Sequence, residues 1–507
     1  QRRDWRRALA AYREVLTAEP DQPDALYLMG AIAVDAGEPD AAVMLFRQAL
    51  VLRPDDAGTH HSLAIALDGL KRHDEALVHS DRALAATPAM AAAWTIRGDT
   101  LLALGREQEA LASHERAVAL APGRADLLGR QAACLMALGQ DAAALAVHDA
   151  AMALDALDPG PIISKGIALN RLDRAAEAMA CFEQALAVAP HNALAKYNQG
   201  LLLLSRGDYA RGWALFEHRW ATPLMWQVQR TCPEPLWLGA QPLAGKTILL
   251  HNDQGLGDAI MLSRFAASVA ARGAQVVLQA PPALVGLLRN VEGVRDCVAR
   301  GDPLPPHDLH CPLFSLPLAL QLRLDSVPAA KGYLRSDPDK AAAWAQRLGL
   351  RRRPQVGLVW SGNPKHDNDR HRTLPLSQLA AALPQVCDYV SLQAVVRAAD
   401  RPVLEASPWL RDFSADLRDF SETAALCEAM DLVVCVDTSV AHLAGAMGKP
   451  TWILLPFPAE YRWLRDRDDT PWYASARLLR QAPDRQWAPL LARLRGELQA
   501  WAQTVPV

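Results

Sequence analysis

The sequence predicts an α-helical solenoid followed by two α/β half-domains, each built on a doubly wound parallel sheet. Two observations lead to this order. Small residues and prolines recur every 34 residues over about the first 220 positions, which is typical of stacked helical hairpins. From about residue 245 onward, short β-branched runs alternate with helical segments, which indicates parallel sheets covered by helices.

The composition is that of a soluble globular protein, and it does not favour nucleic acid or a membrane surface as a partner. Of its 507 residues 51% are hydrophobic and 21% are charged, and the net charge is -3. This balance supports neither nucleic acid nor an anionic membrane surface as a partner. No apolar run is long enough to span a bilayer, and residues 1–7 are polar and basic, so we expect a cytoplasmic protein. The sequence starts at Gln1 rather than at a methionine, which leaves open what precedes it.

The eight cysteines contain no C-x-x-C pair and lie mostly in apolar surroundings. This pattern favours reduced thiols over disulfides or a zinc site.

The repeats occupy residues 1–220. One phase of the period carries Pro20, Pro54, Pro88, Pro122 and Pro190, with Ala156 at the missing position. A second phase carries Gly30, Ala64, Gly98, Ala132, Gly166 and Gly200. Small residues at a fixed phase mark the close contact of two helices in a hairpin, and the proline stops the second helix.

This pattern resembles the tetratricopeptide repeat, which implies a concave face that holds a protein or peptide. Three histidines, His79, His114 and His148, recur in nearly matching phase on the second helices. We interpret them as packing or surface residues rather than as metal ligands.

Residues 221–244 interrupt the repeat and are rich in tryptophan and proline, among them Trp226, Trp237, Pro233 and Pro235. Aromatic residues at this density predict a linker that packs between its neighbours.

The first half-domain is predicted over residues 245–335. We expect strands at 246–251, 275–279, 294–298 and 309–312, and helices at 259–271 and 282–288. The loop 252–258 joins the first strand to the first helix.

The second half-domain is predicted over residues 336–507. We expect strands at 356–360, 389–393, 432–436 and 451–455, and helices at 339–348, 376–383, 423–430 and 440–447. In open α/β sheets, ligands bind at the carboxyl ends of the strands.

Three loops at such strand ends carry candidate functional residues. After strand 432–436, Asp437, Thr438 and Ser439 can cap the next helix, and the free N–H groups of its first turn suit a phosphate. The loop H-N-D-Q-G-L-G-D ends at Asp258, which is either a helix cap or a functional carboxylate. The loop 361–373 contains Lys365 and Arg372 and suits a diphosphate, unless it is simply solvated.

Four motifs together, G-L-G-D, S-G-N-P-K, R-T-L-P and V-D-T-S-V-A-H-L-A-G-A-M-G-K-P, resemble glycosyltransferase family 9, the heptosyltransferases. The resemblance runs from about Gly245 to the C-terminus and is closest to bacterial proteins that join such a domain to tetratricopeptide repeats. It implies a GT-B fold and a metal-independent, inverting sugar transfer from a nucleotide-diphosphate sugar. The second half-domain would hold most of the donor.

The resemblance also implies roles for individual residues. Asp258 would be the catalytic base, and Arg372, where the family has a lysine, would contact the donor diphosphate. The full set of implied donor-binding residues is Gly255, Gly257, Ser361, Gly362, Asn363, Lys365, Arg372, Gln393, Asp437, Thr438, Ser439 and His442. Ser439 departs from the family glycine, and the acceptor-binding features are not evident, so neither heptose nor lipopolysaccharide carries over.

Several alternatives stay open at this point. The acceptor is a protein side chain or an envelope glycan recruited by the repeats. The chain also fits an O-linked N-acetylglucosamine transferase type of enzyme, or a non-catalytic scaffold that binds nucleotide sugars. Two D-x-D triplets, 367–369 and 466–468, would suit a metal-dependent transferase, but the basic residues around them disfavour a divalent ion, and no metal or other cofactor is expected.

Overall fold

The computed structural model describes residues 5–225, 232–328, 332–366 and 368–506. These residues form two compact units, Gln1–Asn192 and Ala193–Val507. The predicted fold class is confirmed, because a helical repeat solenoid precedes a region of parallel sheets. Among the described residues, no helix combines the length and apolar character needed to cross a membrane.

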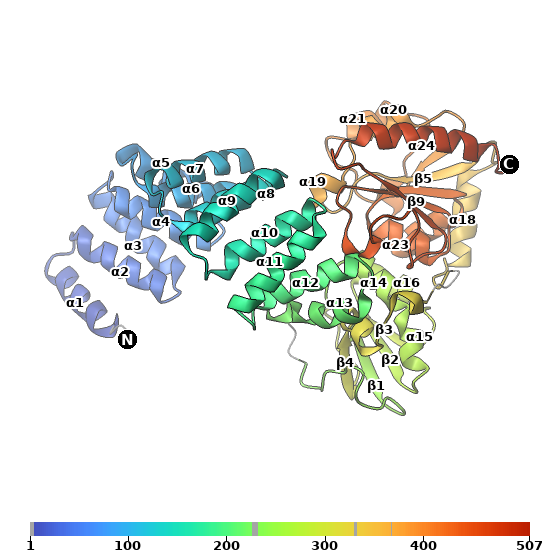
Figure 1. Cartoon of the computed structure of the whole chain (residues 1–507), viewed down its shortest axis with the longest axis horizontal. Helices are drawn as coiled ribbons and strands as arrows, with labels where there is room; N and C mark the ends of the chain where they lie inside the picture. Colours follow the sequence, from blue (N-terminus) through green and yellow to red (C-terminus); the bar gives the residue numbers. More distant parts are fainter. Residues whose placement is uncertain (1–4, 226–231, 329–331, 367, 507) are drawn as a thin grey trace. The chain divides into compact units, whose positions relative to one another are not determined.

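The first unit consists of antiparallel helix pairs joined by short turns (Figure 1). Its helices are α1 (Trp5–Ala18), α2 (Pro23–Asp35), α3 (Pro39–Leu52), α4 (Ala57–Gly69), α5 (His73–Ala86), α6 (Ala91–Ala103), α7 (Glu107–Leu120), α8 (Ala125–Ala137), α9 (Asp141–Leu154), α10 (Pro159–Arg171) and α11 (Ala175–Val188). The second helix of a pair ends just before the predicted proline, as α3 does before Pro54 and α5 before Pro88.

Three glycines of the predicted small-residue phase lie against an aromatic ring of the partner helix. These pairs are Gly30–Phe46, Gly98–His114 and Gly166–Phe182. A Cβ on any of these glycines would approach the ring to 2.6 Å. His114 therefore takes the place that Phe46 and Phe182 hold in their repeats, and burial lowers its pKa to about 4. It is a packing residue, as we expected from the sequence.

The last repeat belongs to the second unit. Helices α12 (Ala193–Ser205) and α13 (Tyr209–Phe216) join the hydrophobic core of the half-domains. Their aromatic rings Trp213 and Phe216 contact Phe314 and Tyr461. The repeat pattern runs to about residue 220, whereas the first compact unit ends at residue 192. The last repeat is therefore part of the solenoid by sequence and part of the second unit by its contacts.

The predicted linker packs against the first half-domain. It begins near the short helices η1 (Glu217–Ala221) and η2 (Pro223–Met225). Trp237 is buried, and its backbone N–H donates to the carbonyl of His310 at 2.8 Å. Trp226 of the predicted linker lies outside the described residues.

The first half-domain contains a parallel sheet with strand order β3-β2-β1-β4. Its elements are β1 (Thr247–His251), α14 (Leu256–Ser263), α15 (Phe265–Ala270), β2 (Gln275–Ala280), α16 (Pro282–Leu288), β3 (Val294–Ala299), β4 (Leu309–Pro312), η3 (Leu313–Ser315), α17 (Leu316–Ala319) and η4 (Leu324–Ser326). The chain runs from β1 outward to β3 and then returns to the other side of β1. The order therefore reverses between β1 and β4, and the loops at this switch point face one crevice.

Arg219, from the end of the last repeat, fills this first crevice. Its guanidinium donates to Asp253 Oδ2 at 3.0 Å and to Ser315 Oγ at 2.9 Å, and it pairs with Glu217. Arg219 and Asp253 are both almost fully buried, and burial raises the pKa of Asp253 even against the charge of Arg219. The crevice of the first half-domain is thus occupied by the protein itself.

The second half-domain contains a parallel sheet with strand order β10-β9-β8-β5-β6-β7. Its elements are α18 (Pro338–Leu348), β5 (Gln355–Val359), α19 (Asp369–Arg372), α20 (Leu376–Ala382), β6 (Asp388–Ser391), α21 (Arg401–Glu405), β7 (Leu410–Arg411), η5 (Ser414–Asp416), α22 (Phe420–Glu428), β8 (Leu432–Val436), α23 (Ser439–Ala446), β9 (Thr451–Leu455), η6 (Tyr461–Trp463), β10 (Ala476–Arg480) and α24 (Trp487–Ala502). Strands β7 and β10 and helix α24 were not predicted.

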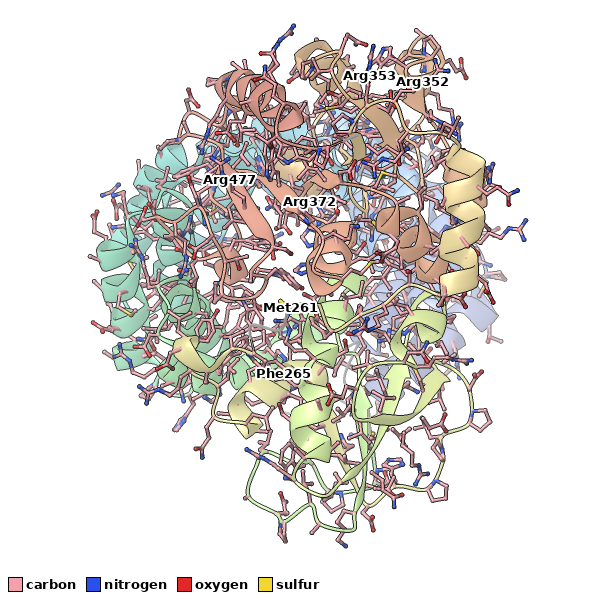
Figure 2. The ribbon with its side chains drawn as sticks, turned by 90° about the vertical axis from the view of Figure 1, so that its right-hand side faces the viewer. Met261, Phe265, Arg352, Arg353, Arg372 and Arg477 are labelled. Atoms are coloured by element: carbon pink, nitrogen blue, oxygen red, sulfur yellow. The ribbon has the colours of Figure 1, made fainter. Side chains whose placement is uncertain are left out.

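Alternate residues of the second sheet belong to two different cores. Val434 and Val436 face the core formed with α20 and α24, whereas Val433 and Cys435 face the core formed with α22 and α23. The second core continues without a break into the first half-domain. Figure 2 shows Met261 and Phe265 in the first half-domain and Arg372 in the second.

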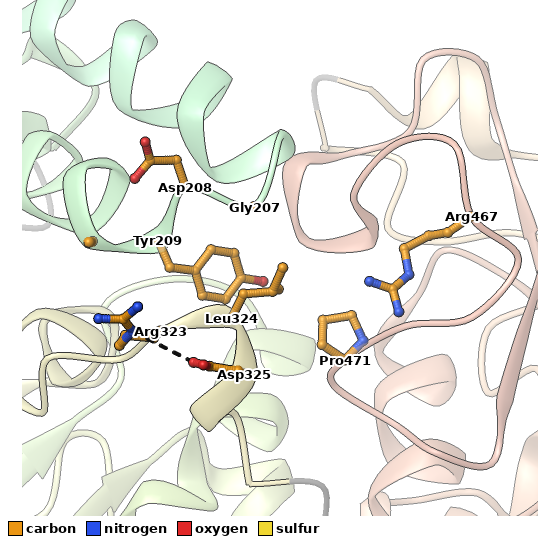
Figure 3. A pocket seen from close by; sticks show the side chains of 9 residues that line it. Gly207, Asp208, Tyr209, Arg323, Leu324, Asp325, Arg467 and Pro471 are labelled. Carbon is orange, nitrogen blue, oxygen red and sulfur yellow. Dashed lines mark ion pairs between the residues drawn. The ribbon is translucent and has the colours of Figure 1, made fainter.

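A cavity of about 490 Å³ lies where the last repeat meets both half-domains (Figure 3). It is lined by Gly207, Asp208, Tyr209, Ala210, Arg323, Leu324, Asp325, Arg467 and Pro471. Three segments that are far apart in the sequence therefore share one charged opening.

Candidate functional site

The candidate site lies at the switch point of the second sheet, between β5 and β8. The chain leaves β5 toward β6 and β7 and later returns to β8 on the other side, so the loops after β5 and β8 diverge and leave room for a ligand. The predicted donor residues Ser361 and Asp437 follow these two strands directly. The structure thus brings the two predicted donor loops together.

Arg372 connects the two loops. It is 9% exposed, and its Nη1 donates to the backbone carbonyl of Asp437 at 3.1 Å. Its guanidinium also lies across Gly362, where a Cβ would approach Nη2 to 2.5 Å. Glycine at this position is therefore needed for the guanidinium to lie beside β8.

Other predicted residues of the 361–373 loop hold the loop itself. The Gln393 side chain donates to the Ser361 carbonyl at 3.0 Å, and Asn363 Oδ1 accepts the backbone N–H of Lys365 at 3.0 Å. The Lys365 side chain is exposed. A partly buried ion pair that the sequence did not reveal joins Asp369 to Arg397 at 2.6 Å and holds the other side of the loop. Asp367 of the first D-x-D triplet lies outside the described residues.

Three buried polar atoms of the two loops have no hydrogen-bond partner among the described residues. These atoms are Ser361 Oγ, Arg372 Nε and Thr438 Oγ1, of which Arg372 Nε still forms an ion pair with Asp369 Oδ1 at 3.5 Å. Thr438 is the N-cap residue of α23, yet its side chain makes no capping bond. Buried polar groups are almost always paired, so unpaired ones at one switch point indicate a place for a polar ligand.

Asp258 lies at the facing helix of the first half-domain. Helix α14 begins at Leu256 rather than at residue 259, and Asp258 is part of its first turn. Its Oδ2 accepts the backbone N–H of Gly255 at 2.9 Å, so Asp258 does act as a helix cap. Its Oδ1 accepts from Arg462 Nη1 at 2.5 Å. The assignment of Asp258 as a base stays a prediction.

Arg462 is the functional residue that the sequence analysis missed. It follows β9 in the loop P-A-E-Y-R-W, so its loop opens at the same edge of the sheet as Asp437. Besides Asp258, its guanidinium pairs with Glu460 at 2.8 Å and lies 3.5 Å from His442 Nε2. The signal that could have found it is its position after a strand next to β8.

His442 is a neutral, tightly held residue. Its Nδ1 is 2.9 Å from the Tyr473 hydroxyl, and its ring stacks on Trp463 with the ring centres 5.2 Å apart. Burial and the charge of Arg462 lower its pKa well below the usual range. Because arginine can only donate, the contact with Arg462 favours an unprotonated Nε2 and a proton on Nδ1.

The pKa values of Asp437 and Glu460, two carboxyls near Arg462, are shifted in opposite directions. Burial and the charge of Glu460 raise the pKa of Asp437 to about 7. Burial also works to raise the pKa of Glu460, but the charge of Arg462 outweighs it, and the pKa is lowered. Near neutral pH, Glu460 is therefore ionised, and Asp437 is the carboxyl of the two that more readily takes up a proton.

Comparisons with known proteins point to the same region. Residues 1–57, 61–125 and 164–217 match the tetratricopeptide repeat family, and residues 417–454 match glycosyltransferase family 9 (heptosyltransferase). The second match covers α22, β8, α23 and β9, which include Asp437 and His442. The chain thus contains tetratricopeptide repeats and, over residues 417–454, a segment that is similar to glycosyltransferase family 9.

Relatives of the repeats and of the family 9 segment are distant. The chain is 26% identical over 339 residues to Protein FlbA of Caulobacter vibrioides. The aligned region covers 61% of this chain and 56% of FlbA. Among solved structures, the TPR protein YrrB is 18% identical, with 36% of this chain and 95% of YrrB covered and a TM-score of 0.33. The TPR protein TTC0263 of Thermus thermophilus is 24% identical, with 36% of this chain and 100% of TTC0263 covered and a TM-score of 0.31.

We predict that Gly257 is required for the contact between α14 and α23. A Cβ at Gly257 would lie 2.6 Å from Cδ2 of His442, whose ring cannot retreat because Trp463 and Tyr473 hold it. Gly257→Ala should therefore lower the free energy of unfolding by about 1–3 kcal/mol in urea titrations.

The matched control is Gly496→Ala, in the middle of α24, where a Cβ would meet no atom within 4 Å. This exchange should raise the free energy of unfolding by about 0.5–1 kcal/mol, because alanine favours the helix. Equal stability of the two variants would contradict the close helix contact.

Proposed function

We propose that the second unit is a metal-independent, inverting glycosyltransferase that takes a sugar from a nucleotide-diphosphate donor. The observation that carries this proposal is the pair of buried hydroxyls without a hydrogen-bond partner among the described residues, Ser361 Oγ and Thr438 Oγ1, which flank the guanidinium of Arg372 at the switch point between β5 and β8. A diphosphate presents several acceptor oxygens and two negative charges, which fit an arginine and hydroxyls of this kind. The match to family 9 over 417–454 supports the same site.

The donor diphosphate would lie between Arg372 and the start of α23. Arg372 is held in place by the carbonyl of Asp437, so its charge is oriented before the ligand arrives. The first N–H groups of α23 have no partner within the helix and add favourable dipoles. As the bond between the sugar and the diphosphate breaks, the electron pair goes to the departing diphosphate, and these groups stabilise its charge.

Asp258 is the proposed base on the opposite side. It would take the proton of the acceptor hydroxyl while that oxygen forms a bond to the anomeric carbon. Its Oδ1 is occupied by Arg462 in this structure, so the acceptor must displace or share this contact. The repeats would recruit the acceptor, since tetratricopeptide repeats are protein-interaction modules.

A non-catalytic nucleotide-sugar binder is the second candidate function. The observation that favours it is that both carboxylate oxygens of Asp258 are already engaged, by Gly255 and by Arg462. A binder and an enzyme share the donor site but differ in what Asp258 does.

We predict that Arg372 binds the donor. Arg372→Ala should weaken the binding of nucleotide-diphosphate sugars by about 1.5–3 kcal/mol in calorimetry, because it removes a charge-assisted phosphate contact. Arg372→Lys should keep part of the affinity. Arg352→Ala, which removes an exposed arginine of the same half-domain, is the control and should bind normally (Figure 2). Unchanged affinity in Arg372→Ala would place the diphosphate elsewhere.

The role of Asp258 is tested by Asp258→Asn, which keeps the shape and can still accept the N–H of Gly255. If Asp258 is the base, donor affinity should stay within about twofold while the rate of transfer falls by about two orders of magnitude or more. The measurement is transfer with the donor and acceptor pair that supports turnover, alongside calorimetry. Full transfer activity in Asp258→Asn would contradict the role of Asp258 as a base and leave it as a helix cap.

We also predict a pH dependence of donor binding. Asp437 has a raised pKa of about 7, so its carboxyl gains a negative charge as the pH rises through 7 and then repels the diphosphate. Affinity for a nucleotide-diphosphate sugar should therefore fall between pH 6 and pH 8, by up to about tenfold per pH unit. Asp437→Asn should remove this dependence. An equal slope in the variant would assign it to another group.

A further inference from the structure

A second group of chemically reactive side chains lies in the first half-domain, away from the proposed donor crevice. Cys232 of the linker, His251 at the end of β1 and His310 of β4 each offer one ligand atom, and these atoms lie within 4.8 Å of one another. The nearest pair is His251 Nε2 and His310 Nδ1, which are 3.1 Å apart. Two imidazole nitrogens on one tetrahedral zinc ion are about 3.3 Å apart, given bonds of about 2.0–2.1 Å.

Cys232 differs from the other cysteines of the chain. The remaining seven are all buried, whereas Cys232 is partly exposed. Burial raises the pKa of several of the buried thiols, for example that of Cys297 to about 11, so they behave as apolar packing groups. Cys232 is therefore the cysteine of the described residues that is partly exposed and offers its sulfur beside two imidazoles.

The backbone holds the three side chains from neighbouring strands. His310 and Leu249 are paired across β4 and β1, and His251 follows two residues later on β1. On its other side, His310 accepts from the backbone N–H of Trp237 at 2.8 Å and donates to the carbonyl of Pro235 at 3.1 Å. The linker that carries Cys232 is thus added to the edge of the sheet, which brings the thiol to the two histidines.

Space and polar neighbours are present next to this group. A cavity of about 340 Å³ has Cys232, Glu234 and His307 in its wall. His307 Nε2 lies 3.2 Å from a carboxylate oxygen of Glu234. The cavity leaves room for a water molecule as a fourth ligand, with Glu234 and His307 as its hydrogen-bond partners.

We propose that Cys232, His251 and His310 bind one divalent ion of the zinc type. One thiolate and two neutral imidazoles are ligands that Zn²⁺ prefers, and binding would release the thiol proton and the proton between the rings. The ion would tie the linker to the carboxyl end of β1, where the loop that leads to Asp258 begins. Its role is structural, so the sugar transfer proposed above stays independent of metal.

The test uses the untagged full chain, stripped of metal with a chelator under reducing conditions. Titration with Co²⁺ should give one equivalent per chain and a thiolate-to-cobalt charge-transfer band, and Zn²⁺ should displace the Co²⁺. Cys232→Ser should lose the band and weaken zinc binding by at least about 100-fold, since even residues that only orient metal ligands cost 10- to 100-fold. His310→Gln should weaken binding similarly.

Cys181→Ala removes a thiol from the first unit and is the control, which should keep both the band and the stoichiometry. Circular dichroism confirms that each variant is folded. Absence of the band in the wild-type chain, or wild-type zinc affinity in folded Cys232→Ser and His310→Gln, would overturn the proposal and leave a hydrogen-bonded histidine pair. Calorimetry with a nucleotide-diphosphate sugar on the metal-free chain tests the donor site separately.

Discussion

The guanidinium of Arg462 is the interaction on which the arrangement of the two half-domains depends. It pairs with Asp258 from the first half-domain and with Glu460 from the second, and it lies against His442. Without this charge, two carboxylates would be buried side by side, which is strongly unfavourable. Beside this pairing, α14 packs closely on α23, and the contact requires glycine at position 257. Together with burial, this charge lowers the pKa of His442, and it also lowers the pKa of Glu460, whereas burial and the charge of Glu460 raise the pKa of Asp437.

The switch points of the two sheets differ in what their arginine side chains contact. In the first half-domain, Arg219 brings a buried charge into the crevice, and Asp253 and Ser315 satisfy it. In the second half-domain, Arg372 is held at the crevice wall, but polar atoms beside it stay unpaired. In each crevice one buried arginine Nε, that of Arg219 or of Arg372, lacks a hydrogen-bond partner among the described residues, and the second crevice adds the hydroxyls of Ser361 and Thr438. The last repeat is therefore part of the structure of the first half-domain as well as part of the solenoid.

Local sequence patterns were sufficient for most of the fold. Buried parallel strands read as short apolar runs, so β1, β5, β8 and β9 were predicted nearly to the residue. The two-residue strand β7 is too short to leave a pattern. Helix α14 starts earlier than predicted because the carboxylate of Asp258 reaches back to the N–H of Gly255, which only the folded turn reveals. The structure likewise gives Gly257 and Gln393 packing and loop-holding contacts that spacing could not distinguish from ligand contacts.

The sequence by itself predicted the solenoid, the buried parallel strands and the polar segments after them that contain Asp437, Thr438 and Arg372, because repeat periodicity and short apolar runs are local properties. Only the tertiary structure decided which charges meet. Arg462 and Asp258 lie about 200 residues apart in the chain, and their pairing depends on how α14 packs on α23. Cys232, His251 and His310 likewise share no motif, and they meet because a parallel sheet places distant segments side by side.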